Sequence, residues 1–113
     1  MGKDRAGVNR VILVGRVFGE PRMHKIGKNR WLHFTLITEE KIHGAKDALH
    51  EEKHDVCIYG QNSSQDKYDV KEHDVLFIQG RLSTHTFTDA EGIKRYKTEI
   101  VASMVERIST QNK

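Results

Sequence analysis

The chain has 113 residues, of which 36% are hydrophobic and 31% are charged, so it suits one modest core and is neither a membrane protein nor a disordered chain. No apolar stretch approaches the roughly 18 residues of a spanning helix, and the first residues lack the apolar segment of a secretory signal. The formal net charge of +3 permits binding to a polyanion, and the single cysteine, Cys57, excludes an internal disulfide and fits a reducing cytoplasm.

Alternation of apolar and polar residues predicts five strands in one domain that spans residues 1–113, with its core in residues 7–105. The expected strands are residues 9–18, 31–38, 52–59, 75–87 and 94–105. Pro21 would follow the first strand, where a missing amide donor does no damage. Residues 62–70 predict a short helix between the third and fourth strands, and residues 88–92 predict a hairpin turn.

Three apolar runs end on glycine, at Gly15, Gly60 and Gly80. Glycine weakens a flat strand, so its usual role in such a run is a bulge or a sharp bend where a sheet coils on itself. Repeated bends of this kind predict a small closed barrel.

Strand parity sorts the side chains into a core face and an outer face. The expected core residues are Leu32, Phe34, Leu36, Val56, Ile58, Leu76, Ile78 and Leu82. The expected outer residues are Arg10, Ile12, Val14, Arg16, Trp31, His33, Ile37, Lys53, Cys57, Tyr59, Phe77, Arg81, His85 and Phe87. A barrel this small cannot cover Ile12, Val14 and Phe77 by itself, so these three predict an interface between copies of the chain.

Aromatic residues interleave with cations on the outer face, which is typical of single-strand binding because bases stack on aromatic rings while Lys and Arg follow the phosphates. The predicted binding residues are Arg10, Trp31, Lys53, Tyr59, Arg81, His85 and Phe87. The alternative is that the aromatic residues fill an oligomer interface. Residues 22–31 hold four cations and no acid, and are expected to form either a solvated loop or a loop that contacts phosphates.

Two segments carry a family resemblance: Gly7-Val8-Asn9-Arg10 opens the first apolar run, and residues 87–101 read FTDAEGIKRYKTEIV. Together with the glycine-ended strands, they resemble the DNA-binding domain of bacterial-type single-stranded DNA-binding proteins (SSB) over about residues 7–102. The resemblance implies an all-β fold, a five-stranded OB-fold barrel with one short helix between strands 3 and 4. It also implies a non-enzymatic protein without cofactors that protects single-stranded DNA during replication, repair or recombination.

The same resemblance implies a homotetramer in which first strands pair, and a cytoplasmic, nucleoid-associated location in a bacterium. Family members place aromatic residues at four ligand-facing positions, of which Tyr59 and Phe87 match two, whereas Ile42 and Lys53 stand at the others. Residues 103–113 are neutral to basic and lack the acidic tip of cellular relatives. No recruitment of proteins through a tail is therefore expected.

Three alternatives remain open. A dimeric protein similar to primosomal replication protein N of replication restart would differ in mass, and an adaptor barrel that has lost DNA binding would lack affinity. A zinc hydrolase would use His50-Glu51-Glu52-Lys53-His54, which fits HExxH and needs a helix to bring both histidines to one metal. This segment runs into a strand-like stretch, so we expect surface histidines and no metal site there. No other catalytic motif stands out, and Cys57 alone is weak evidence for a nucleophile.

Overall fold

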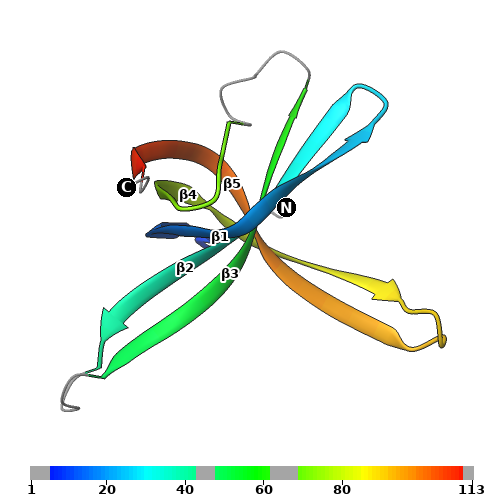
Figure 1. Cartoon of the computed structure of the whole chain (residues 1–113). Helices are drawn as coiled ribbons and strands as arrows, with labels where there is room; N and C mark the ends of the chain where they lie inside the picture. Colours follow the sequence, from blue (N-terminus) through cyan, green and yellow to red (C-terminus); the bar gives the residue numbers. More distant parts are fainter. Residues whose placement is uncertain (1–5, 43–47, 62–68, 111–113) are drawn as a thin grey trace.

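The computed structural model describes residues 6–42, 48–61 and 69–110. It contains five strands: β1 (Val11–Ile26), β2 (Asn29–Lys41), β3 (Leu49–Gln61), β4 (Asp74–Thr88) and β5 (Lys94–Thr110). They close into a barrel in the order β1-β2-β3-β5-β4 (Figure 1). All neighbours are antiparallel except β3 and β5, which pair in parallel. The predicted all-β, five-stranded barrel is confirmed.

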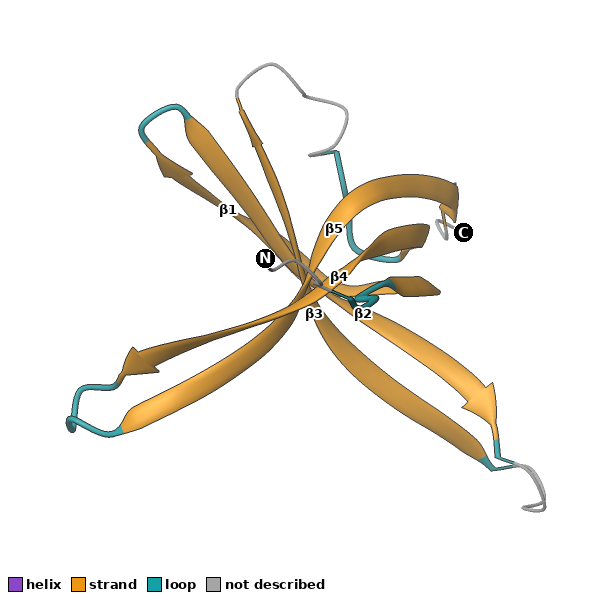
Figure 2. Cartoon of the chain, turned by 180° about the vertical axis from the view of Figure 1, so that it is seen from behind, coloured by secondary structure: helices purple, strands orange, loops and turns teal. Residues whose placement is uncertain are grey.

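The part of the chain that the structure describes contains no helix (Figure 2). Among these residues there is accordingly no helix long and apolar enough to span a membrane. The predicted helix over residues 62–70 lies outside the described residues except for Asp69 and Val70, which are not helical. The hairpin turn predicted at residues 88–92 is confirmed, since Gly92 adopts a φ of 81° and donates its amide to the carbonyl of Asp89 at 3.0 Å.

Hairpins β1–β2, β2–β3 and β4–β5 extend from the barrel in different directions (Figures 1 and 2). The expectation of a basic loop at residues 22–31 is wrong, because these residues form both arms of the β1–β2 hairpin, with His24 opposite Trp31. Pro21 also lies within β1 rather than after it. It falls where the pairing with β2 breaks between Phe18 and Arg22, so its missing amide costs no ladder hydrogen bond.

Two glycines allow the strands to coil closely, as predicted. A Cβ atom at Gly15 would lie 2.4 Å from the carbonyl oxygen of Ile37, and one at Gly80 would lie 2.2 Å from that of Val101. At the first of these points β1 changes partner from β4 to β2. The second lies at a register shift between β4 and β5. Backbone contact at both positions therefore requires glycine.

Strand parity predicted most of the core. The buried cluster consists of Val17, Leu32, Phe34, Leu36, Val56, Ile58, Leu76, Ile78, Ile100 and Ala102. Leu82 is wrongly predicted, because it is 49% exposed where β4 has left β1 and continues along the hairpin with β5. Ile37 and Cys57 are buried although parity placed them outside. The close approach of β1 at Gly15 contacts the backbone of Ile37, and side chains from β2 and β5 surround Cys57.

Candidate nucleic-acid interface

An aromatic pair lies on the outer face of the β2–β3 hairpin. Trp31 and Tyr59 are register partners on adjacent strands, and their ring centroids are 4.5 Å apart with an interplanar angle of 52°. Tyr59 is 40% exposed, and its hydroxyl donates a hydrogen bond to Oδ1 of Asn29 at 2.8 Å. This bond and the contact with Trp31 hold the tyrosine ring in place while leaving part of its surface open to a ligand.

Trp31 also lines a groove of about 530 Å³ between the β1–β2 and β4–β5 hairpins. The other lining residues are His24, Lys25, His33, His85 and Glu99. The structure thus brings two of the predicted residues, Trp31 and His85, to one groove. His24 and Lys25 were not singled out from the sequence, and the only signal for them was the basic character of residues 22–31.

Arg10 and Arg81 form a second group. They line a smaller hollow of about 260 Å³ where the start of the chain meets β4. Asn9 fixes this contact, since its side-chain amide donates to the carbonyl of Leu82 and its Oδ1 accepts from the Leu82 amide, both at 2.9 Å. Arg10 and Arg81 therefore border one hollow, and arginine side chains are common partners of phosphate groups.

Lys53 and Phe87 lie apart from these groups. The ammonium group of Lys53 is 4.8 Å from the ring centroid of Phe18, a cation–π contact with a residue that the sequence analysis missed. Phe87 is 46% exposed near the end of the β4–β5 hairpin, opposite Arg95. The seven predicted residues therefore lie in several separate groups on the surface rather than in one cluster.

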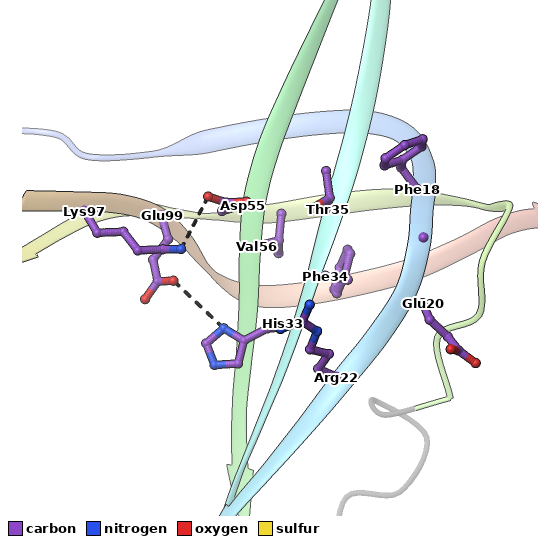
Figure 3. A pocket seen from close by; sticks show the side chains of 11 residues that line it. Phe18, Glu20, Arg22, His33, Phe34, Thr35, Asp55, Val56, Lys97 and Glu99 are labelled. Carbon is purple, nitrogen blue, oxygen red and sulfur yellow. Dashed lines mark ion pairs between the residues drawn. The ribbon is translucent and has the colours of Figure 1, made fainter. Parts of the chain in front are cut away.

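Phe18 also borders a hollow of about 370 Å³ (Figure 3). Arg22, His33, Asp55 and Lys97 are among its other lining residues. The ammonium group of Lys97 pairs with the Asp55 carboxylate at 3.6 Å, so this cation is already engaged within the protein. Arg22 is another exposed positive group of this hollow, and it belongs to the β1–β2 hairpin whose residues 22–31 hold four cations.

One carboxylate, Glu99, lies among the histidines of the groove. Its side chain is 11% exposed, with oxygens 4.0 Å from Nδ1 of His33 and 3.8 Å from Nδ1 of His85. Burial lowers the pKa of His33, against the opposing effect of Glu99. Burial raises the pKa of the Cys57 thiol to about 11, and the neighbouring Glu99 adds to that rise. The thiol is thus protonated at neutral pH, which argues against a nucleophilic role.

The HExxH segment lies in β3 rather than on a helix. Residues four apart on a strand are about 13 Å apart, so His50 and His54 cannot share one zinc ion. His50 instead contacts Glu52 at 2.7 Å, and His54 contacts the hydroxyl of Thr38 at 3.0 Å. The interpretation as a zinc hydrolase is wrong, because the helix that this motif requires is replaced by a strand.

The predicted interface residues lie on another side of the barrel, where β1 pairs with β4. Ile12 is 56% exposed, Val14 is 52% exposed, and Phe77 is half-buried opposite Val14. These three side chains form an apolar patch on the β1–β4 pair. Apolar side chains gathered on an exposed surface are a common feature of protein interaction sites.

Comparisons with known proteins agree with this architecture. The model of the single-strand binding protein family matches residues 8–108. The "Single-stranded DNA-binding protein 1" of Clostridium acetobutylicum is 24% identical over 107 residues, which cover 92% of this chain and 96% of that protein. A solved structure described as "Plasmodium falciparum SSB complex with ssDNA" has a TM-score of 0.79 and 23% sequence identity, and covers 95% of this chain and 100% of that one.

Proposed function

The chain belongs to the single-strand binding protein family, and we propose that it is a non-enzymatic protein that binds single-stranded DNA with little sequence preference. The observation that carries this proposal is the Trp31–Tyr59 pair beside a groove lined by Lys25 and His85. We further propose that it protects strands opened in replication, repair or recombination, and that it does so at the nucleoid in the cytoplasm. The two relatives described above, one named for single-stranded DNA and one solved with it, support the same function.

Sequence-independent binding needs surfaces that accept any base and charges that follow the backbone. Aromatic rings meet the first need, since stacking contributes about 1 to 3 kcal/mol per base whatever the base. Tyr59 and Phe87 offer exposed rings, and Trp31 lies against Tyr59. Arg10 and Arg81 meet the second need because they share one hollow at the edge of β4.

In this proposal a single strand passes through the groove between the β1–β2 and β4–β5 hairpins. Its bases stack near Tyr59 and Trp31 at one end and at Phe87 on the β4–β5 hairpin, with His85 between them. Lys53 contributes charge farther along β3, beside Phe18. The spread of these residues over several hairpins suits a ligand that is long and flexible, because a small molecule would contact only one of the groups.

We also propose that the β1–β4 patch of Ile12, Val14 and Phe77 joins copies of the chain, with a homotetramer as the expected assembly. Exposed Ile12 and Val14 support this, since water would otherwise cover a contiguous apolar surface. A dimer is the alternative, and it would favour a role similar to primosomal replication protein N. The mass in solution distinguishes the two.

Fluorescence of Trp31 tests DNA binding directly, because it is the only tryptophan of the chain. Titration with oligo(dT) should quench the emission, and the apparent affinity should fall as salt rises. Duplex DNA of the same length is the control and should bind more weakly. If oligo(dT) leaves both Trp31 emission and the anisotropy of a labelled oligonucleotide unchanged at low salt, the proposal is wrong, and the adaptor barrel without DNA affinity is favoured.

A further inference from the structure

Three side chains with metal-binding atoms meet on the outer face, one from each of three strands. His33 comes from β2, Cys57 from β3 and Glu99 from β5, and their ligand atoms all lie within 4.8 Å of one another. His33 and Cys57 are register partners, and β5 runs parallel to β3 beside them. Figure 3 shows the His33 ring and the Glu99 carboxylate facing each other across this part of the sheet.

We propose that His33, Cys57 and Glu99 bind one zinc ion, or a divalent transition metal of similar preference, on the outer face of the barrel. The fourth position faces the groove, where Nδ1 of His85 lies 3.8 Å from an oxygen of Glu99. A site of this composition is absent from the sequence expectations, which considered metal binding only at His50 and His54 and predicted none.

The distances suit such an ion. Zinc binds sulfur at about 2.3 Å and imidazole nitrogen or carboxylate oxygen at about 2.0 to 2.2 Å, so ligand atoms of a tetrahedral site are roughly 3.3 to 3.8 Å apart. His33 and Glu99 are 4.0 Å apart, and no pair in the cluster exceeds 4.8 Å. Small side-chain rotations would therefore complete the geometry without moving the strands.

The donor types select the metal. A thiolate and an imidazole favour zinc and related transition metals, whereas magnesium and calcium prefer sites made of oxygen atoms. Cys57 is completely buried, so it is held in place by its strand rather than free to react with any solute. The groove is lined by His33 and Glu99, the two ligands that lie beside the thiol.

Metal binding also balances the local charge. In the metal-free protein the thiol of Cys57 is protonated, because burial raises its pKa to about 11. Zinc would displace the thiol proton to solvent, and the ion, the thiolate and the carboxylate together would be neutral. Arg81 and Lys97 are near enough to the thiol to favour the thiolate that zinc requires, and Lys97 is also paired with Asp55 at 3.6 Å.

Cobalt titration of the reduced, metal-free protein tests the site without DNA, so it succeeds or fails independently of the proposed function. We expect one Co²⁺ per chain, a near-ultraviolet sulfur-to-cobalt charge-transfer band and visible bands of a tetrahedral site, all lost when Zn²⁺ is added. Cys57→Ser should abolish the sulfur band. His33→Gln and Glu99→Gln should weaken cobalt binding at least tenfold, and His50→Ala, also in β3, is the matched control that should bind as the parent does.

Two results would overturn the proposal. One is a parent protein without a sulfur-to-cobalt band at equimolar cobalt. The other is a band that persists with unchanged affinity in both His33→Gln and Glu99→Gln, since the ion would then use Cys57 without the cluster. Glu99→Gln keeps the size of the side chain, so it decides the question even if Cys57→Ser fails to fold; circular dichroism of each variant checks that the barrel is retained.

Discussion

The β1–β4 pair and the β2–β3–β5 sheet present opposite chemistry on the surface of one barrel. The β1–β4 pair exposes aliphatic Ile12 and Val14 beside Phe77. The β2–β3–β5 sheet carries the Trp31–Tyr59 pair and the Glu99 carboxylate among histidines. An aliphatic patch gains most from another apolar surface, whereas aromatic rings beside titratable groups can hold a polar, charged ligand. We therefore propose self-association for the β1–β4 side and DNA binding for the other side.

The most severe test of this division charges the apolar patch. Val14→Glu should split the assembly, because burying an unpaired carboxylate at an interface costs on the order of several kcal/mol. Light scattering should show a lower mass at micromolar concentration, while each chain keeps its fold since position 14 is exposed in the single chain.

Thr86→Glu is a suitable control, because this residue is exposed on the part of β4 that pairs only with β5. Its mass should equal that of the parent. If the parent is a monomer, or if Val14→Glu leaves the mass unchanged, the β1–β4 patch is not the interface, and the proposed division between the two sides is wrong.

The second test removes rings from the proposed DNA side. Alanine at Trp31, Tyr59 or Phe87 should each weaken binding of labelled oligo(dT) by about 1 to 3 kcal/mol, measured by fluorescence anisotropy. Tyr96→Ala is the control. Tyr96 is an exposed aromatic residue of β5, and it follows Arg95, the register partner of Phe87, so its side chain points to the opposite face of the hairpin. It should bind as the parent does. Unchanged affinity in folded Tyr59→Ala and Phe87→Ala would mean that the rings serve an interface.

Much of the barrel could be predicted because its causes are local. Alternation revealed all five strands, and the glycines at positions 15 and 80 marked where backbones meet. Strand ends were predicted too short because hairpin residues 22–31 lie outside the core and show no clear apolar period. Leu82 was misassigned for a related reason: its parity is that of the core face, but β4 pairs with β1 only as far as Gly80, so Leu82 lies on the hairpin beyond the core.

The site was harder to predict because register, rather than sequence spacing, decides which side chains meet. Parity placed Trp31 and Tyr59 on one face, but only the pairing of β2 with β3 makes them partners. The cluster of His33, Cys57 and Glu99 combines residues from three strands, so no short sequence motif contains it. The HExxH segment had a recognisable local pattern and nevertheless formed a strand.

Salt dependence gives a smaller effect that sharpens the division between the two sides. Each phosphate contact to a single strand contributes about −0.7 to the slope of log affinity against log salt. Few cations lie on the proposed DNA side, so the slope of the parent should be shallow. Arg81→Gln should reduce its magnitude by about 0.7, whereas Arg107→Gln, near the far end of β5 beside Asp74, should not change it. An unchanged slope in Arg81→Gln would remove Arg81 from the phosphate path.

The smallest expected effect lies at the tip of the β4–β5 hairpin, outside both surfaces. Arg95 donates a hydrogen bond to the Asp89 carboxylate at 2.7 Å and, together with the amides of Ile93 and Glu91, lowers the pKa of Asp89. Because the folded pKa lies below the unfolded one, these contacts stabilise the fold above the unfolded pKa of about 3.9, and their effect is lost as pH falls through the folded pKa.

Asp89→Asn should therefore lower the urea midpoint slightly at pH 7, and the difference from the parent should shrink as the pH falls below about 4. The variant should keep the parent's mass and its affinity for oligo(dT), because Asp89 belongs to neither the β1–β4 patch nor the groove. A difference in midpoint that grows on acidification would show that the carboxylate opposes folding at this turn. A loss of DNA affinity at pH 7 would instead extend the binding surface past Phe87 to the hairpin tip, because Arg95 opposite that ring would have lost the partner that orients it.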